Sequence, residues 1–226
     1  MNRIFLLGDS TCADKSEDKR PETGWGMVLQ RLVKKPWQVV NLAENGRSTK
    51  SFLEKGLFDR CLGQLSEGDW VFIQFGHNDS KDDEQRHTDP WTTYQGNLIL
   101  MTDTVLEREA HPVLLTPICR RRFDEQGNLV QTHGDYPKAM ISLAKSRNYP
   151  VLDMTEKTYQ LLAYLGPKES KNSPFFVPRM IADLSAGHIS IMYGFRGPNY
   201  CTVSACASSN NAFFDAFNYI RLGKAT

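Results

Sequence analysis

The chain has 226 residues, of which 40% are hydrophobic and 23% charged, enough for one well-buried α/β core and a further segment. The net charge is +1 and the basic residues are scattered, which argues against nucleic acid or an anionic membrane as a partner and favours a small or neutral molecule. The five cysteines are an odd number without CxxC spacing, which argues against both a disulfide framework and a zinc site.

Short apolar runs alternate with segments of helical periodicity over the first 165 residues. The first run begins at Arg3 and breaks at Gly8, as a buried parallel strand does when it delivers a side chain to the rim of a sheet. The predicted strands are 3–7, 38–43, 69–75, 112–118 and 150–154. The predicted helices, with apolar residues three and four apart, are 24–35, 91–108 and 136–147. This rhythm predicts an α/β fold, a three-layer αβα sandwich around a five-stranded parallel sheet.

Near residue 166 the character of the chain changes. Residues 166–172 are polar and include Gly166 and Pro167, and the residues that follow are apolar and rich in small side chains. We therefore expect a domain of residues 1–165, a junction at 166–172 and a separate segment of residues 173–226.

Three chemically suited residues follow the first three predicted strands. Ser10 follows the first strand in a Gly-Asp-Ser turn, Gly46 follows the second, and Asn78 follows the third in a Gly-His-Asn-Asp stretch. In a parallel sheet, ligands bind beyond the carboxyl ends of the strands. Acyl transfer needs a hydroxyl nucleophile and hydrogen-bond donors aimed at the developing oxyanion, and a serine N–H, a glycine N–H and an asparagine amide supply them.

These three blocks, in this order, resemble the SGNH, or GDSL, hydrolase superfamily. The stretches 24–26, 116–123 and 133–137 are similar to its rhamnogalacturonan acetylesterase branch. The resemblance implies a flavodoxin-like fold for residues 1–165, Ser10 as the nucleophile, and an oxyanion hole of Ser10, Gly46 and Asn78. It also implies a serine esterase that removes acetyl groups from pectin-type or rhamnogalacturonan-type carbohydrate esters. Such an enzyme takes a small-molecule or oligosaccharide ester as substrate, without a cofactor or a metal.

Two histidines and an arginine run near these blocks have plainer interpretations. His77 is interpreted as a residue that packs the loop or contacts substrate, in preference to a general base. His133 is interpreted as part of a turn, in preference to half of a metal site. Arg120, Arg121 and Arg122 are typical of a solvated loop, and the alternative is a sugar contact, because they too follow a strand end.

The resemblance stops at the catalytic base. A serine nucleophile is normally activated by a histidine that a carboxylate orients. In this family both come from a late Asp-x-x-His block after strand five. Beyond Asp153 the only histidine is His188, and the nearest preceding aspartate, Asp183, is five residues earlier, which does not fit that spacing. The base is therefore unidentified, and we expect impaired activity.

Residues 173–226 resemble a different family, the β-ketoacyl-acyl-carrier-protein synthases of the thiolase fold. The matching stretches are 173–178, 186–194, 196–198 and 203–209. There, Cys206 would lie at the N-terminus of a predicted helix 207–222, where the helix dipole favours the thiolate, and it is the alternative nucleophile. The family's paired histidines and lysine come from a later half, so Cys206 is interpreted as a small apolar residue on a tail helix. We expect that helix to cover the esterase sheet.

The leading interpretation is thus an impaired carbohydrate esterase that carries a foreign C-terminal segment. The alternatives are a fragment of a β-ketoacyl synthase and a non-catalytic sugar-binding domain. A base near Ser10 distinguishes the esterase from the sugar-binding domain.

No stretch approaches the ~20 apolar residues of a membrane span. Met1 lies two residues before the first strand, so we expect a cytoplasmic protein as written, or a secreted or periplasmic one if the N-terminus is truncated. The oligomeric state and the exact ester stay open.

Overall fold

The computed structural model describes residues 3–19, 21–169, 217–218 and 221. By its contacts the chain divides into two compact units, Met1–Pro174 and Phe175–Thr226, and the first of them is described below. Within residues 173–226 the structure describes only positions 217, 218 and 221, which are helical. The described part therefore leaves out the rest of the synthase-like stretch, the rest of the predicted helix 207–222, and Asp183, His188 and Cys206.

The first unit is built on a five-stranded sheet in which every pairing is parallel, in the order β2-β1-β3-β4-β5. The strands are β1 (Arg3–Gly8), β2 (Gln38–Asn41), β3 (Trp70–Gln74), β4 (His111–Leu115) and β5 (Val151–Leu152). This order is that of flavodoxin-like folds, with the reversal between β1 and β3. All five predicted strands are confirmed, and so is the predicted parallel sheet.

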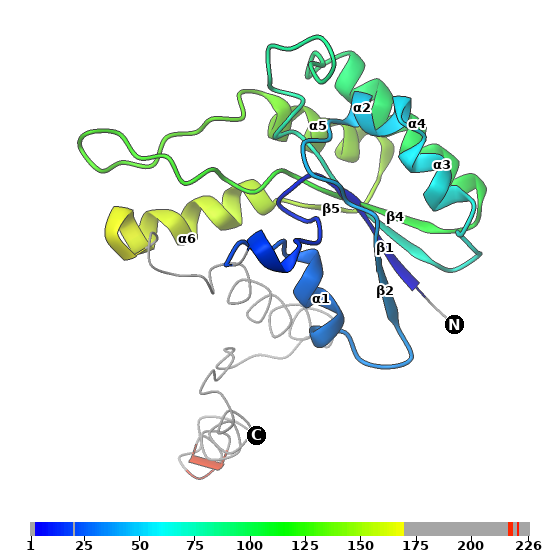
Figure 1. The fold of residues 1–226 in the computed structure, drawn as a ribbon, viewed down its shortest axis with the longest axis horizontal. Coiled ribbons are helices and arrows are strands. Elements are labelled where there is room, and N and C mark those ends of the chain that lie inside the picture. The colour runs from blue at the N-terminus through cyan, green and yellow to red at the C-terminus, as the bar shows by residue number, and fades with distance from the viewer. Residues whose placement is uncertain (1–2, 20, 170–216, 219–220, 222–226) are drawn as a thin grey trace. The chain divides into compact units, whose positions relative to one another are not determined.

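Six helices accompany the sheet among the described residues. They are α1 (Gly26–Leu32), α2 (Thr49–Glu54), α3 (Leu57–Leu62), α4 (Thr93–Glu107), α5 (Tyr136–Arg147) and α6 (Met154–Glu169), with a 3₁₀ turn at Glu17–Lys19. Helices α2 to α5 lie on one side of the sheet, and α1 and α6 lie on the other (Figure 1). The three-layer sandwich is therefore confirmed. None of the described helices has the length and apolar character needed to cross a bilayer.

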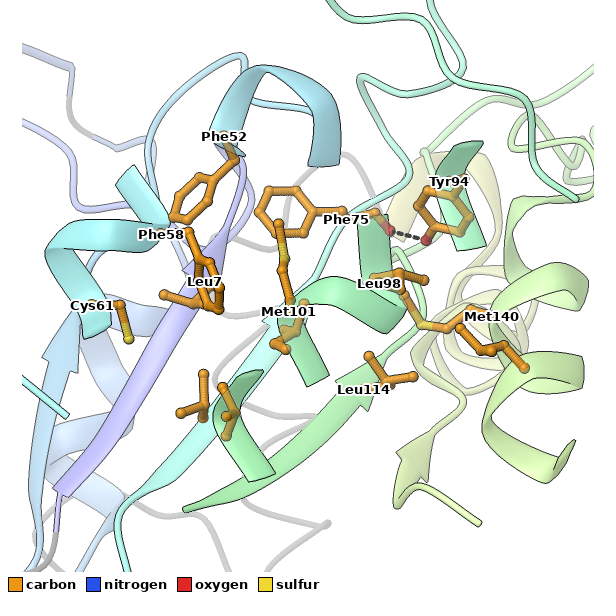
Figure 2. Close-up of a cluster of buried hydrophobic side chains, with 14 of the residues drawn as sticks. Leu7, Phe52, Phe58, Cys61, Phe75, Tyr94, Leu98, Met101, Leu114 and Met140 are labelled. Atoms are coloured by element: carbon orange, nitrogen blue, oxygen red, sulfur yellow. Dashed lines mark hydrogen bonds between the residues drawn. The ribbon is translucent and has the colours of Figure 1, made fainter. Parts of the chain in front are cut away.

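The main core lies between the sheet and helices α2 to α5 (Figure 2). Alternate residues of each strand face it, as the two-residue period of a strand requires. The fully buried side chains there include Phe5 and Leu7 of β1, Ile73 of β3 and Leu114 of β4. The helices contribute six large side chains to this core: Phe52, Phe58, Tyr94, Leu98, Met101 and Met140. Each such side chain stabilises the fold by roughly 1.5–3 kcal/mol through burial, so this layer holds the carboxyl ends of the strands in place.

Candidate active site

Ser10 lies in a tight turn directly after β1. The backbone N–H groups of Cys12 and Ala13 both donate to the carbonyl of Asp9, at 3.1 and 2.9 Å. The Asp9 carboxylate accepts from the backbone N–H and the hydroxyl of Thr11, at 2.9 and 2.8 Å. Neither the hydroxyl nor the backbone N–H of Ser10 makes a hydrogen bond within the described part of the chain. The turn therefore fixes its neighbours and leaves both groups of the half-buried Ser10 available.

A buried polar network attaches this turn to the sheet. Gln74, the last residue of β3, pairs in register with Gly8 and is almost fully buried. Its side-chain carbonyl accepts from Nε1 of Trp25 at 2.7 Å and lies 3.2 Å from the hydroxyl of Thr11. Because an unpaired buried amide is costly, these partners favour one arrangement of the strand end and the turn.

The Gly-Trp-Gly stretch before α1 packs directly against the same turn. The backbone N–H of Trp25 donates to the carbonyl of Thr11 at 3.0 Å, and that of Gly26 donates to the carbonyl of Cys12 at 3.2 Å. A Cβ atom on Gly24 would lie 2.0 Å from the carbonyl oxygen of Ala13. Only a glycine permits this approach, so the stretch 24–26 is explained as the wall behind the Ser10 turn.

Gly46 lies in the loop after β2, the strand next to β1. Its φ is +74°. Among the described residues, its N–H makes no hydrogen bond and no atom lies within 4 Å of the position of a Cβ. Two contacts join this loop to the Ser10 turn. The N–H of Glu44 donates to the carbonyl of Gly8 at 3.1 Å, and the ammonium of Lys15 donates to the side-chain oxygen of Asn45 at 2.6 Å.

Asn78 lies in the loop after β3, on the other side of β1. Its side-chain amide donates to the carbonyl of Arg47 at 2.9 Å, which joins this loop to the one that carries Gly46. An amide has two hydrogens, so a second donor stays available. The next residue, Asp79, is fully buried and anchors the loop through Thr49, Thr88 and the N–H of Gly76.

The loops that carry Gly46, Ser10 and Asn78 thus follow three neighbouring strands, β2, β1 and β3, at one edge of the sheet. Hydrogen bonds join the loop after β2 to each of the other two. The structure brings together the loops on which the three predicted site residues lie. Their roles as nucleophile and oxyanion hole remain a prediction.

Charge around the Ser10 turn is shifted by burial. Burial raises the pKa of Asp9 to about 6, against the opposing effect of the Thr11 hydrogen bonds and of the charges of Arg120 and Lys15. Burial likewise raises the pKa of Asp79 to about 6, although Thr49 and Thr88 donate to it. The carboxylates next to the site are therefore costly to ionise and are held by hydrogen bonds more than by ion pairs.

His77 and His133, which are 56 residues apart, pack against each other. Nδ1 of His77 is hydrogen-bonded to Nε2 of His133, and the rings are stacked with centroids 4.5 Å apart and an interplanar angle of 4°. Burial lowers the pKa of both rings, and the charge of Arg120 lowers it further. Both rings are therefore neutral at pH 7, and neither contacts Ser10 by hydrogen bond.

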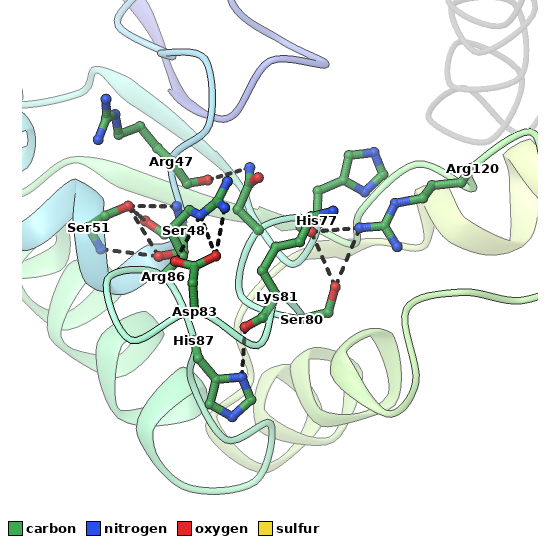
Figure 3. A network of polar contacts seen from close by, with 11 residues as sticks. Arg47, Ser48, Ser51, His77, Ser80, Lys81, Asp83, Arg86, His87 and Arg120 are labelled. Atoms are coloured by element: carbon green, nitrogen blue, oxygen red, sulfur yellow. Dashed lines mark hydrogen bonds and ion pairs between the residues drawn. The ribbon is translucent and has the colours of Figure 1, made fainter.

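Arg120 is not a solvated loop residue. Its guanidinium is half-buried and donates to the carbonyl of Thr132 at 2.9 Å, to the carbonyl of His77 at 2.6 Å and to the hydroxyl of Ser80 at 3.4 Å. Figure 3 shows it beside His77 and Ser80. The expectation for Arg120 was wrong because the carbonyls of two loops, distant in sequence, need a donor there. Arg121 and Arg122 are exposed, as expected.

No described histidine acts on Ser10 through a hydrogen bond. His77 and His133 pair with each other, His87 is hydrogen-bonded to the carbonyl of Lys81, and His111 packs on Trp70 at the opposite end of the sheet. Asp153, which follows β5, instead accepts from the hydroxyl of Thr116 and the N–H of Glu156, each at 3.0 Å, and so caps α6. Within the described residues no cluster of three or more His, Cys, Asp or Glu is arranged to hold a metal.

Comparison with known proteins finds that the chain is similar to two different families. The GDSL-like lipase/acylhydrolase family matches residues 6–173, and the N-terminal domain of β-ketoacyl synthases matches residues 141–226. The chain is 36% identical over 169 residues to YesY of Bacillus subtilis, named a probable rhamnogalacturonan acetylesterase, over 74% of this chain and 77% of that protein. It is 43% identical over 74 residues to 3-oxoacyl-[acyl-carrier-protein] synthase 2 of Synechocystis sp., which covers 33% of this chain and 17% of that enzyme.

A further relative and a solved structure agree with the first similarity. The chain is 44% identical over 169 residues to the rhamnogalacturonan acetylesterase RhgT of Bacillus subtilis, over 75% of this chain and 72% of that protein. The fold is similar to a crystal structure of another Bacillus subtilis protein, with a TM-score of 0.71 and 21% identity, over 88% of this chain and 58% of that one. With the family match spanning residues 6–173, the chain belongs to the GDSL-like lipase/acylhydrolase family.

Proposed function

We propose that this chain is a serine esterase that removes acetyl groups from carbohydrate esters of the pectin or rhamnogalacturonan type. Two curated relatives with that name, at 44% and 36% identity, support the substrate class. The observation that supports the site most strongly is the joining of the three loops after β2, β1 and β3, with the hydroxyl and N–H of Ser10 and the N–H of Gly46 left without partners among the described residues.

In this proposal the hydroxyl oxygen of Ser10 attacks the acetyl carbonyl. The proton of the hydroxyl leaves to a base, and the carbonyl oxygen becomes an oxyanion that accepts from the N–H of Ser10, the N–H of Gly46 and the second amide hydrogen of Asn78. Collapse expels the sugar oxygen, which takes up a proton, and leaves an acetyl ester on Ser10. Water then attacks that ester and releases acetate, which restores the serine.

The rate depends on the base. Since no described histidine is hydrogen-bonded to Ser10, turnover relies on solvent or on residues outside the described part of the chain. Removing a triad member in serine hydrolases leaves ~10³–10⁴-fold catalysis over water, from binding and the oxyanion hole alone. We therefore expect slow hydrolysis of an activated acetyl ester.

The test combines chemical labelling with turnover. A fluorophosphonate probe is expected to modify Ser10, as identified by peptide mass spectrometry, and 4-nitrophenyl acetate is expected to be hydrolysed slowly. Ser10→Ala should abolish both, while Ser16→Ala, at an exposed serine of the same loop, should leave both unchanged. Equal hydrolysis by Ser10→Ala and the parent would overturn the proposal. Saturable binding of acetylated oligosaccharide without labelling or turnover would instead favour the non-catalytic sugar-binding alternative.

A further inference from the structure

The stacked pair of His77 and His133 has a hydrogen-bonding capacity that the esterase chemistry above does not use. Nδ1 of His77 is engaged with Nε2 of His133. The second nitrogen of each ring, Nε2 of His77 and Nδ1 of His133, has no partner within the described part of the chain. The two free nitrogens therefore lie at the two ends of one coupled pair.

These two ends have different surroundings. Among the described residues, the buried side-chain nitrogens and oxygens without a hydrogen-bond partner are Nε of Arg47 and Nδ1 of His133. His133 is only 1% exposed, so its Nδ1 is shut off from solvent. Nε2 of His77 is not among those buried atoms, so it reaches the surface of the half-buried His77 ring.

This asymmetry selects a tautomer. A neutral imidazole carries one proton, so either His77 donates to His133 or His133 donates to His77. The first arrangement leaves an unpaired N–H at the buried Nδ1 of His133. The second leaves only an unpaired acceptor there, and buried orphan N–H groups are the rarer and more costly case. The second arrangement is favoured, and it places the remaining proton of His77 on the accessible Nε2.

The ring stays uncharged in this role. Burial, Arg120 and Lys81 all lower the pKa of His77. Burial, His77 and Arg120 lower the pKa of His133 in the same way. Arg120 also donates to the backbone carbonyl of His77 at 2.6 Å, so the backbone that carries the ring is fixed as well. A fixed, neutral N–H donor suits a neutral acceptor such as a hydroxyl or ring oxygen of a sugar.

His77 immediately precedes Asn78, so this donor lies on the loop after β3 at the same edge of the sheet as Ser10. We propose that Nε2–H of His77 donates to an oxygen of the saccharide that carries the acetyl ester, and that His133 is a positioning residue that fixes the tautomer of His77. The inference rests on the proposed function, because it concerns the sugar part of the substrate of that site.

Binding in a non-hydrolysing background tests it. In Ser10→Ala protein, titration calorimetry with an acetylated rhamnogalacturonan oligosaccharide is expected to give a Kd that His77→Phe weakens about 2- to 10-fold, the effect of losing one neutral hydrogen bond. His77→Gln places an amide N–H at a similar reach and is expected to restore most of the affinity. His111→Phe, at an exposed histidine at the far end of β4, is the matched control and should not change the Kd.

Ring nitrogen NMR gives a readout that a purely structural role would not move. In Ser10→Ala the Nε2 of His77 is expected to be protonated and its resonance to shift on addition of the oligosaccharide. In Ser10→Ala with His133→Phe the ring is expected to populate both tautomers. Protonation of Nδ1 of His77 in the parent, an unchanged Kd in folded His77→Phe, or an absence of saturable binding would each overturn the inference. Labelling of Ser10 by the fluorophosphonate is independent of these results, so it separates this failure from failure of the proposed function.

Discussion

Gly24→Ala is expected to destabilise the fold and to displace the turn that carries Ser10. The new Cβ would lie 2.0 Å from the carbonyl oxygen of Ala13 and 2.7 Å from that of Cys12, and both are backbone atoms. Real Cβ contacts are essentially never below 3.0 Å, so the backbone around Ala13 has to retreat by about 1 Å. Overpacking of this kind costs about 1–3 kcal/mol.

The net loss is smaller than the clash alone. Alanine reduces the entropy of the unfolded chain, which returns about 0.4–1 kcal/mol. We therefore expect a loss of about 1–2 kcal/mol, or a Tm lower by about 2–8 °C in a unit of this size. The same displacement moves Ser10, and a misplacement of about 1 Å costs up to about 10²-fold in rate.

Gly96→Ala is the matched control. Gly96 is exposed on α4, and within the part of the chain that the structure describes no atom lies within 4 Å of the position of its Cβ. There alanine is expected to stabilise by about 0.5–1 kcal/mol and to leave activity unchanged. Urea unfolding followed by tryptophan fluorescence measures the stability of both variants, because the four tryptophans lie in Met1–Pro174. A midpoint for Gly24→Ala equal to or above that of the parent would refute the close approach of residues 24–26 to the Ser10 turn.

Four further predictions have distinct readouts. Burial raises the pKa of Asp9 from 3.8 to about 6, so ionisation in the folded state lowers stability as pH rises through that window. In urea titrations the free energy of unfolding of Asp9→Asn should rise relative to the parent by up to about 3 kcal/mol between pH 4 and pH 8, and a constant difference contradicts this. Burial raises the pKa of Asp69, but hydrogen bonds from Arg3 and Ser66 outweigh it and hold this pKa below its ordinary value. Asp69→Asn should therefore lower the stability above pH 4, and the loss should shrink as the pH falls below 4, which acid unfolding curves measure. Asn78→Ala should lower the rate of 4-nitrophenyl acetate hydrolysis by about 10²-fold with little change in KM, and an unchanged rate would remove Asn78 from the oxyanion hole. Cys206 should stay unmodified by an acyl-carrier-protein thioester in mass spectrometry, and stoichiometric acylation there would make the synthase-like segment the functional part.

The sheet could be predicted because its strands are strong local signals. Each is a short apolar run that ends at a glycine, a proline or a polar residue, and parallel strands covered on both faces are apolar throughout. Pro117 follows Leu115 by two residues, and Gly76 follows Gln74 in the same way. The sequence therefore predicts that the residues just after these strand ends carry the chemistry.

Helices α2, α3 and α6 could not be read from periodicity. Helices α2 and α3 have six residues each, too few to show a 3.6-residue repeat, and their visible signal is the reciprocal capping of Ser48 and Ser51 at the start of α2. Helix α6 buries Thr155 and Thr158, whose hydroxyls donate to carbonyls and interrupt the apolar stripe. It is broken at Gly166 (φ 67°), where the sequence indicated only a junction.

The pairing of His77 with His133 and the burial of Arg120 had no local signal at all. They depend on the loops after β3 and β4 meeting at one edge of the sheet, which is a property of strand order. A sequence shows that a histidine lies in each loop, but only the fold shows that the two rings stack. Side chains that join distant loops are for this reason the part of a site that sequence reasoning misses first.

Residues 141–173 match both families, and the structure resolves what they do in this chain up to Glu169. Val151 and Leu152 pair in parallel with Leu114 and Leu115 of β4. In the helix that follows, the hydroxyl of Thr158 accepts from the backbone N–H of Cys119 at 2.8 Å, which joins α6 to the loop after β4. These residues therefore act as the fifth strand and following helix of an esterase sheet. What that sheet does not provide among its described residues is a base for Ser10, so the rate of acetyl ester hydrolysis becomes a direct test of whether the remaining residues of the chain supply one.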